Sequence, residues 1–389
     1  MMFCLGSAAE AGPDAIRMAV LDDMSGPFSD IQGPGDVVAV KMAVEDFGGK
    51  VLGRPIIVLT GDHQNKADVG AGLARHWFDV DGVDVIPGLG NSAVALAVQE
   101  IARNSRKIDI ATSVATSDLT QRACSPYGVH WVFDTYALAK GAVTALAKQG
   151  QTDWFFLTAD YAYGEAMEQD ASAIVRQVGG RVVGSVRHPL NTEDFSSFLL
   201  RAQSSPAQVV GFANAGSDLV NSIKQAAEFK LDAHGKRMVA FAAQLTNIHA
   251  IGLAAAQGLM FVEAFYWDQN AETRAWSARF RTLHGRPPTM MQAGIYGAAM
   301  HYLRSVEVAG SDDADAVMAQ MRKRRINDFM TKDGWIRGDG RVMRDMYLLR
   351  AKSPAESKEE WDLLEVLATI PAEEAFRPVT ESECPLLKK

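Results

Sequence analysis

The sequence has few cysteines and none of the common metal-binding or nucleophile motifs. Its 389 residues include 3 Cys and 8 His, without an H-x-x-x-H or C-x-x-C spacing. A G-x-S-x-G elbow and a G-x-x-x-x-G-K-[ST] loop are also absent. The run 79–84 resembles the start of a calcium loop, but Gly90 occupies the twelfth place, where Glu is needed. We therefore expect no metal, no cofactor and no enzyme activity.

Long basic runs and long apolar runs are also missing. Lys plus Arg number 39 and Asp plus Glu 47, a formal net charge of −8, and the basic run at 322–325 has only four residues. A weakly acidic chain without a long basic run suits neither nucleic acid nor anionic lipid. One stretch, 238–262, lacks charged residues, but Gln244, His249 and two glycines interrupt it. It predicts a buried strand, a loop, a helix and another strand rather than a membrane span.

The chain is too long for one hydrophobic core. Single cores stop growing near about 250–300 residues, so 389 residues, 48% of them hydrophobic, predict two domains. Strands and helices are predicted to alternate, which is typical of α/β folds with parallel sheets. The strands are expected at 16–21, 54–59, 83–87, 107–111, 154–158, 181–186, 209–212 and 237–241. The helices are expected at 36–47, 67–78, 92–103, 137–148, 165–178, 195–202, 219–229, 272–283 and 290–308, before short tail strands with a turn at 338–340.

The segment 88–93 follows a predicted strand and opens a helix. It fits the G-x-G-x-x-A pattern of dinucleotide enzymes, but it lies in the third strand–helix unit rather than the first. A helix N-terminus offers free N–H groups to a small anion whatever the ligand, and Asn91 and Ser92 add side-chain donors. The alternative is that these two residues only cap their own helix.

Two other predicted strands end in residues that suit a ligand. In the segment 111–120, five of ten residues are Ser or Thr, which indicates a polar ligand shelf or a set of Ser/Thr turns without a ligand. The segment 161–165 lies at the equivalent end of a later strand, as part of a site or as a helix cap with surface tyrosines. Ligands of open parallel sheets bind at these carboxyl ends.

Taken together, these segments resemble the type I periplasmic binding proteins of the branched-chain amino acid transporter family. The pieces are 24–27 after the first strand, 90–92, 111–120 and 160–165, in this order, and the resemblance runs from about Ile16 to the tail. It implies an α/β fold of two Rossmann-like lobes with parallel sheets, a ligand cleft at the hinge and three chain crossings. The expected lobes are 14–134 plus 264–345, and 135–263 plus 346–389. Residues 1–13 are expected to be a residual signal, cut near Ala9–Ala11, or a disordered leader.

The resemblance also implies a role for individual residues. Asn91 and Ser92 would bind a ligand carboxylate, and Tyr163 would close over the ligand from the second lobe. The remaining expected ligand-binding residues are Phe28 and Ile31 at the mouth, Ser113, Val114 and Thr116 in the first lobe, and Asn214 and Gln244 in the second.

The sequence departs from the family where amino-acid binders hold the ligand's ammonium group. Those proteins place an acid after the strand at 237–241, but the segment 242–245 here has none. They often place an aromatic residue after the strand at 209–212, where this chain has Asn214, Ala215 and Gly216. Because an unpaired buried ammonium is costly, we expect a carboxylate without an amine, for example an aromatic acid such as a benzoate or a phenylpropanoid.

The implied function is that of a periplasmic solute-binding protein of an ABC importer. It would close on its ligand, act as a monomer, and dock on an inner-membrane permease driven by a cytoplasmic ATPase, without binding nucleic acid. Two alternatives remain open: an NAD(P)-linked α/β oxidoreductase that uses the segment 88–93, and a ligand-sensing domain of the same fold.

Two of the three cysteines form a candidate disulfide. Cys4 lies in the expected leader, which leaves Cys124 and Cys384, both near a proline in loop-like sequence. A secretory leader would place them in an oxidising compartment, so we predict a bridge that ties the C-terminal tail to the body. Two buried free thiols are the alternative.

Overall fold

The first of two large sheets is built by the N-terminal third of the chain. The computed structural model describes residues 15–387. The strand order of this sheet is β2-β3-β1-β4-β5-β6, and all pairs except β2 with β3 are parallel. The strands are β1 (Ile16–Asp22), β2 (Lys50–Val51), β3 (Arg54–Asp62), β4 (Val85–Gly88), β5 (Ile108–Ala111) and β6 (Gly128–His130). β2 and β6 are too short to be evident from the sequence.

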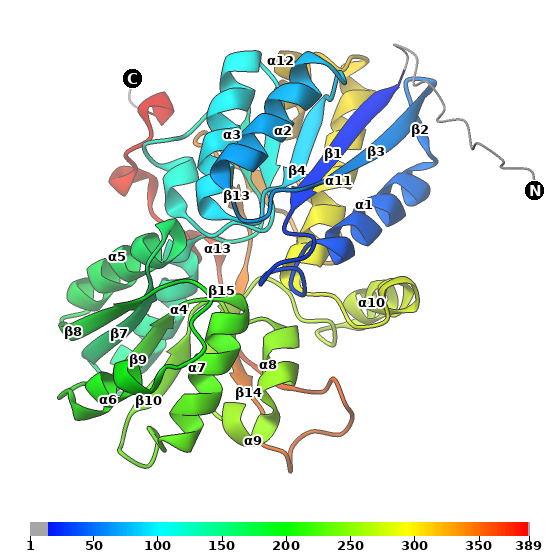
Figure 1. Ribbon diagram of the computed structural model, residues 1–389. Coiled ribbons are helices and arrows are strands. Elements are labelled where there is room, and N and C mark those ends of the chain that lie inside the picture. Colours follow the sequence, from blue (N-terminus) through cyan, green and yellow to red (C-terminus); the bar gives the residue numbers. More distant parts are fainter. Residues whose placement is uncertain (1–14, 388–389) are drawn as a thin grey trace, which may run out of the picture.

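Helices from two distant parts of the chain pack around this sheet (Figure 1). They are α1 (Pro34–Phe47), α2 (Ala67–Asp79), α3 (Ser92–Ser105), α10 (Ala271–His284), α11 (Met290–Ala309) and α12 (Ala314–Lys323). Helix α11 packs against α1, and its N-terminus is fixed by a capping box between Thr289 and Gln292. The first lobe therefore contains a segment that follows the second lobe in the sequence.

The second sheet has seven strands in the order β15-β14-β11-β10-β9-β7-β8. The pairs from β8 to β11 are parallel, whereas β14 and β15 join the edge in antiparallel pairs. Its strands are β7 (Asp153–Ala159), β8 (Arg181–His188), β9 (Val209–Ala213), β10 (Arg237–Ala240), β11 (Met260–Glu263), β14 (Met346–Ala351) and β15 (Leu364–Ile370). The predicted parallel sheets are thus confirmed, with an antiparallel extension that the pattern did not reveal.

Seven helices accompany the second sheet in the described part of the chain: α4 (Thr135–Ala147), α5 (Ala162–Gln177), α6 (Ser196–Ser204), α7 (Gly216–Glu228), α8 (Leu245–Ile251), α9 (Leu253–Ala256) and α13 (Ala372–Ala375). The uncharged stretch 238–262 contains β10, two short helices and β11, close to the prediction. None of the helices within residues 15–387 combines the length and the apolar character that crossing a membrane requires.

Three connections join the two sheets. They run between β6 and α4, between β11 and α10, and from β13 to β14. Before the third, β12 (Trp335–Ile336) and β13 (Val342–Met343) form an antiparallel hairpin around the predicted turn at 338–340. Arg341, fully buried, donates to the Phe133 carbonyl at 2.9 Å and lies 3.6 Å from the Asp134 carboxylate. It therefore links the first connection to the third.

The C-terminal tail returns to the first lobe. Cys384 forms the predicted disulfide with Cys124, with 5.7 Å between their Cα atoms, and Glu383 pairs with Arg122 at 2.9 Å. The segment predicted for the second lobe as 346–389 therefore contacts the first lobe near its end, in the part that includes the short 3-10 helices η2 (Val379–Glu381) and η3 (Pro385–Leu387). The predicted leader, with its signal-like site and Cys4, lies outside the described residues.

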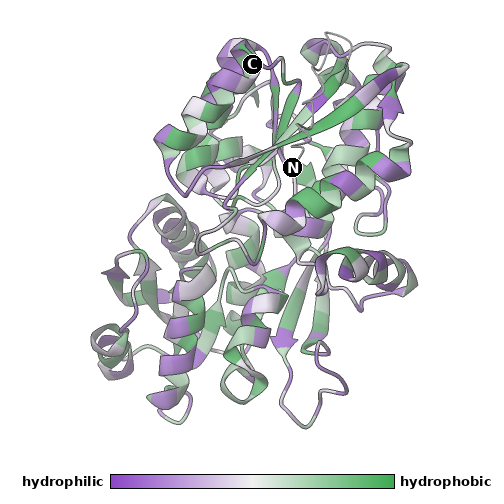
Figure 2. Cartoon of the chain, turned by 45° about the vertical axis from the view of Figure 1, so that its right-hand side comes forward, coloured by the Kyte–Doolittle hydropathy of each residue, from purple (hydrophilic) through white to green (hydrophobic). Residues whose placement is uncertain are grey.

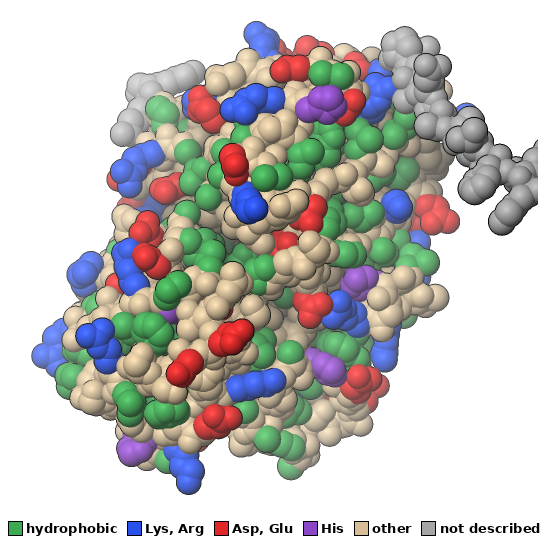
Figure 3. All heavy atoms as spheres, viewed as in Figure 1, with side chains coloured by type: hydrophobic (Ala, Val, Ile, Leu, Met, Phe, Trp, Pro, Cys, Tyr) green, Lys and Arg blue, Asp and Glu red, His purple; other side chains and the backbone are tan. Residues whose placement is uncertain are grey.

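The core is divided among three clusters of buried apolar residues. One runs through both lobes and includes Trp131, Trp154 and Tyr302, while the others lie on one face of each sheet, around Phe212 and around Trp77. Hydrophobic strands run through the middle of both lobes in Figure 2. On the face drawn in Figure 3, acidic and basic side chains are interspersed. Two cores joined by a common cluster explain how 389 residues fold without a linker.

Candidate functional site

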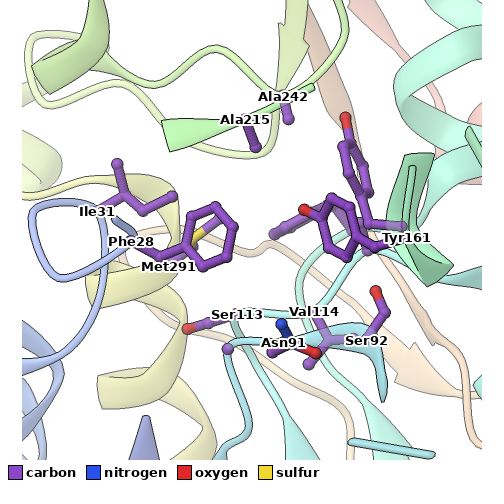
Figure 4. Close-up of a pocket in the computed structure, with 14 residues that line it drawn as sticks. Phe28, Ile31, Asn91, Ser92, Ser113, Val114, Tyr161, Ala215, Ala242 and Met291 are labelled. Atoms are coloured by element: carbon purple, nitrogen blue, oxygen red, sulfur yellow. The ribbon is translucent and has the colours of Figure 1, made fainter. Parts of the chain in front are cut away.

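A cavity between the lobes gathers residues from both sheets (Figure 4). It encloses about 390 Å³ of space, including the part open to solvent. Its lining consists of Phe28, Ile31, Gly90, Asn91, Ser92, Ser113, Val114, Ala115, Phe133, Tyr161, Tyr163, Ala215, Ala242 and Met291. None of these described side chains carries a charge, so recognition must use neutral donors, ring faces and shape.

The N-terminus of α3 forms the polar wall of the cavity. Asn91 is the N-cap, and its Oδ1 accepts from the N–H groups of Ala93 and Val94. Its amide nitrogen lies 3.4 Å from Asn65 Oδ1. The side chain of Asn91 is thus used in the helix cap, which was the alternative interpretation of this residue.

Ser92 and the loop after β5 supply donors that are not used within the protein. Among residues 15–387, the N–H groups of Ser92, Val114 and Ala115 have no hydrogen-bond acceptor, and neither has the Ser92 hydroxyl. All three residues line the cavity. Several free N–H groups at a helix N-terminus and an adjacent loop make a site for a small anion.

Behind this wall lies a pair of buried carboxyl groups, Asp22 and Asp36. The Gly90 N–H donates to Asp22 at 2.9 Å, and the Ser113 hydroxyl donates to Asp36 at 2.8 Å. Burial raises the pKa of Asp36 to about 7, and burial together with the neighbouring Asp36 raises the pKa of Asp22 well above its usual value. Both shifts favour the neutral acid, so the pair carries less negative charge near neutral pH than two ordinary carboxylates would.

The loop after β1 covers the mouth of the cavity with Phe28. It is held by Asp23, which accepts from the N–H of Gly26 at 2.7 Å, from the N–H of Phe28 at 2.9 Å and from the Asn65 amide at 2.6 Å. A Cβ at Gly26 would lie 2.6 Å from the Asp23 carboxylate, which explains the glycine in the segment 24–27. The same network reaches Asn91 through Asn65.

The second lobe contributes aromatic and small side chains. Tyr161 stacks on Phe28 across the cleft with 6.5 Å between ring centroids, and Tyr163 lies 5.7 Å from Tyr161. Ala215 and Ala242 line the opposite part of the wall (Figure 4). Gly216, with φ of +59°, brings the second lobe so near that a Cβ would lie 2.6 Å from the Pro27 carbonyl. The lobes are therefore in contact, as in a closed binding protein.

Seven of the ten predicted ligand-binding residues line this cavity: Phe28, Ile31, Asn91, Ser92, Ser113, Val114 and Tyr163. The other three were expected there, but the structure places them elsewhere. Thr116 caps the 3-10 helix η1 (Ser117–Thr120) by accepting from the Asp118 N–H. Asn214 donates to Ser222 at 3.1 Å, and Gln244 is the buried N-cap of α8. Nearby residues line the cavity instead: Ala115 beside Thr116, Ala215 beside Asn214, and Ala242 two residues before Gln244.

Sequence reasoning missed seven lining residues, and most of them carry no local signal. Ala115, Ala215 and Ala242 lie beside predicted residues, so the strand ends were found but not the side chain that faces the cavity. Gly90 and Tyr161 belong to the segments on which the resemblance rested. Phe133 in a crossing segment and Met291 in α11 reach the cavity only through the tertiary fold.

Comparison with known proteins identifies the class to which this fold and cavity belong. The sequence model of the periplasmic binding protein family matches residues 15–358, so the chain belongs to this family. It is a solute-binding protein of an ABC transporter and not an enzyme. The family implies a place outside the cytoplasm, a small-molecule ligand and a permease partner.

Individual relatives agree with this assignment. A periplasmic binding protein from Burkholderia mallei is 47% identical, with 96% of this chain and 100% of that chain covered and a TM-score of 0.94. A branched chain amino acid ABC transporter ligand-binding protein from Burkholderia xenovorans is 39% identical, with 96% and 100% covered and a TM-score of 0.87. A Leu/Ile/Val-binding protein homolog from Brucella melitensis is 26% identical, with 80% of this chain and 82% of that protein covered.

More distant proteins share the fold alone. A Rhodopseudomonas palustris solute-binding protein in complex with benzoate is 21% identical, covers 92% of this chain and 97% of its own, and has a TM-score of 0.82. A leucine-binding protein from Thermotoga maritima is 20% identical, covers 92% and 99%, and has a TM-score of 0.80. The fold therefore serves different ligands, and the ligand of this chain must be argued from its own cavity.

Proposed function

We propose that this protein captures an aromatic carboxylate without an amino group and delivers it to the permease of its transporter. The observation that carries the proposal is the division of the cavity. Free N–H groups and the Ser92 hydroxyl lie on one wall, and aromatic or small side chains make up most of the rest. A carboxylate matches the first wall and an apolar ring matches the second.

No acidic side chain is among the described residues that line the cavity, and this argues against an amino acid as the ligand. An α-ammonium group would need a carboxylate or several free acceptors inside the closed cavity, and burying it unpaired is costly. Asp22 and Asp36 do not line the cavity, and each already accepts a hydrogen bond, Asp22 from the Gly90 N–H and Asp36 from the Ser113 hydroxyl. The space left by Ala215 and Ala242 suits a flat ring.

Closure of the two lobes is how this site would work. A ligand that contacts both walls binds the closed arrangement more tightly than the open one. The difference between these two binding free energies is the amount by which the ligand stabilises the closed arrangement. Phe28 from the first lobe and Tyr161 from the second already meet over the cavity. A ligand between the walls then turns binding into a change of shape that a permease can recognise.

The test is a set of thermal-shift and calorimetric titrations with benzoate, 3-phenylpropanoate, cinnamate, leucine and NADH. We expect an aromatic acid to stabilise the protein by about 2.7 kcal/mol at a hundredfold excess over Kd. Leucine and NADH are expected to give no shift. Stabilisation by leucine without stabilisation by any aromatic acid would refute the proposal, and binding of NADH would revive the dinucleotide interpretation of the segment 88–93.

A further inference from the structure

We propose that the first lobe carries a second binding site, for the phosphate group of a small molecule, in a groove between α11 and the loop that follows α12. This inference is independent of the proposed function, because none of the residues that line this groove lines the cavity between the lobes. It assigns a role to two residues of the short basic run at 322–325.

The groove lies between one face of α11 and the segment 324–329, in a region where α11 and α12 pack against each other (Figure 1). It encloses about 600 Å³ of space, including the part open to solvent. Arg304 lines it from α11, about 20 Å further along this helix than Met291, which lines the cavity between the lobes. The basic end of the groove is therefore well separated from that cavity.

Three arginines line the groove, and two of them have no partner within the described residues. Arg304 and Arg324 make no hydrogen bond or ion pair with any of residues 15–387. Arg325 lies over the ring of Trp335, 5.1 Å from its centroid, and 3.7 Å from the exposed Asp333 carboxylate. Positive charges that share a groove repel each other, and a bound anion would offset this repulsion.

The acidic side chain of the groove does not neutralise these arginines. Asp328 Oδ1 accepts from the N–H groups of Met330 at 2.8 Å and Thr331 at 2.6 Å. Its Oδ2 lies against α11, where a Cβ at Gly297 would be 2.7 Å away. Burial raises the pKa of Asp328, and the nearby charge of the buried Arg344 opposes this shift. The charge of Asp328 is thus compensated by Arg344, which does not line the groove.

Backbone hydrogen bonds fix the loop that carries two of the arginines. Ile326 and Gly334 exchange both of their N–H···O bonds, at 2.8 and 3.0 Å. The N–H of Arg324, at the end of α12, donates to the Gln320 carbonyl at 3.0 Å. Because the backbone is already in place, a ligand would need to order only the side chains, which lowers the entropic cost of binding.

A helix dipole does not account for this arrangement. Basic residues at the end of a helix are often explained by the negative end of its dipole, and Arg324 at the end of α12 fits that explanation. Arg304 does not, because it belongs to α11, whose last turn contains no basic residue. The convergence of arginines from two elements on one groove therefore calls for an anion.

The chemistry of the groove favours a phosphate ester. Guanidinium groups are planar donors that match phosphate oxygens two at a time, and several of them suit a doubly charged anion. Elsewhere the lining is largely apolar, with the half-buried Met300 and Phe329 and the ring of Tyr296. Burial lowers the pKa of His301 to about 4, so this residue adds no charge. A concave site on an acidic chain suits a soluble ester better than an anionic membrane surface.

Lys323 provides a matched control. It is exposed and adjacent to Arg324 in the same basic run, but it does not line the groove. Lys323→Gln and Arg324→Gln each remove one positive charge and keep a polar side chain. Their comparison separates binding in the groove from a general attraction of anions to the basic run. Ala242→Phe serves a different purpose, because it fills the cavity between the lobes and leaves the groove intact.

The experiment measures Kd for phenyl phosphate by calorimetry with the wild type and with Arg304→Gln, Arg324→Gln, Lys323→Gln and Ala242→Phe, after melting temperatures have confirmed that each variant is folded. We expect the wild type to bind with a Kd below about 1 mM. Arg304→Gln and Arg324→Gln should each weaken binding at least about tenfold, since each removes charge-assisted hydrogen bonds. Lys323→Gln should change Kd by less than about threefold, and Ala242→Phe should bind like the wild type.

Each other outcome overturns the inference. No saturable binding by the wild type up to about 1 mM would do so, and so would equal weakening by Lys323→Gln and the two arginine variants. Binding that only Ala242→Phe abolishes would place phenyl phosphate between the lobes. Sedimentation with phosphatidylglycerol vesicles, lost in Arg304→Gln and without binding of phenyl phosphate, would assign the arginines to a membrane surface. None of these results depends on binding of benzoate, so this inference and the proposed function can fail separately.

Discussion

The two walls of the cavity differ in the kind of chemical group that each presents to a ligand. The first-lobe wall uses backbone N–H groups and the Ser92 hydroxyl, fixed by the cap of α3 and by the buried pair Asp22 and Asp36. The second-lobe wall consists of the rings of Tyr161 and Tyr163 and of two alanines. Under the proposed function, the first wall binds the ligand's carboxylate and the second wall selects among ligands by shape.

This difference predicts which wall sets the ligand preference of this protein. A helix N-terminus that binds a carboxylate depends on backbone geometry, which changes little when side chains change. The second wall depends on side-chain volume at positions such as Ala215 and Ala242, which a single substitution alters. Ligand preference should thus respond to changes in the second lobe, and overall affinity to changes in the first.

We expect the largest effect on ligand binding from a substitution that fills the space beside the second-lobe wall. Ala242→Phe places a ring in the space that we assign to the ligand, so binding of every aromatic acid should fall at least about a hundredfold. The exposed Ala254 in α9 offers a control, because Ala254→Phe adds the same ring away from the cavity. Calorimetry measures the loss, and tight binding by Ala242→Phe would show that the ligand lies elsewhere.

Loss of the disulfide is expected to affect the stability of the tail and not the cavity. Cys384→Ser releases the bridge between residues 260 positions apart and should reduce the free energy of unfolding by about 2–4 kcal/mol. Urea unfolding with and without reductant measures this. The free-thiol count of the denatured wild type should rise by two on reduction, and a constant count would contradict the bridge.

Removal of the hydroxyl donor from the first-lobe wall should weaken the binding of all ligands to a similar extent. Ser92→Ala deletes a hydroxyl that has no partner within the described residues, and a lost hydrogen bond to a charged group corresponds to about 1.5–3 kcal/mol of binding free energy. The control is Ser105→Ala, at the exposed C-terminal end of the same helix. Unchanged affinity for the best ligand would disprove the carboxylate site, provided that the melting temperature is preserved.

The smallest effect is a pH dependence of the first wall. Burial raises the pKa of Asp36 to about 7, whereas an unfolded chain gives it a value near 3.9. The folded state thus binds the extra proton between about pH 4 and 7, and the contribution of this group to stability decreases as the pH rises through that range. As Asp36 gains its proton below about pH 7, the pair with Asp22 becomes less negative, so affinity for a carboxylate should be several-fold higher at pH 6 than at pH 8.

The variant Asp36→Asn tests this origin of the pH dependence. It removes the titrating group and should flatten both the affinity and the stability profiles between pH 5 and 8, whereas Asp232→Asn, at an exposed site, should leave both unchanged. Urea unfolding and calorimetry at the two pH values provide the measurements. If the affinity and stability of Asp36→Asn still change with pH, the pH dependence comes from another group.

The sequence was most informative where a polar or aromatic segment directly follows a predicted strand. The cap at Asn91, the hydroxyl-rich segment after β5 and the tyrosines after β7 were recognisable because each follows a strand, and the carboxyl ends of parallel strands face the ligand. The pairing of Cys124 with Cys384 followed from their number and surroundings. Thr116, Asn214 and Gln244 were predicted for the site but do not line the cavity, since a pattern finds a strand end but not the direction of each side chain.

The sequence by itself determined the α/β class, the two lobes, the family and the position of the polar wall of the cavity. These depend on hydrophobic periodicity, strand ends and helix caps, which are local properties of the chain. Only the tertiary structure decided that Phe133 and Met291 complete the cavity, that Asp36 lies behind Ser113, and that the tail ends on the first lobe. Those contacts join residues far apart in the chain, and their geometry is set by packing of the two sheets rather than by any local pattern.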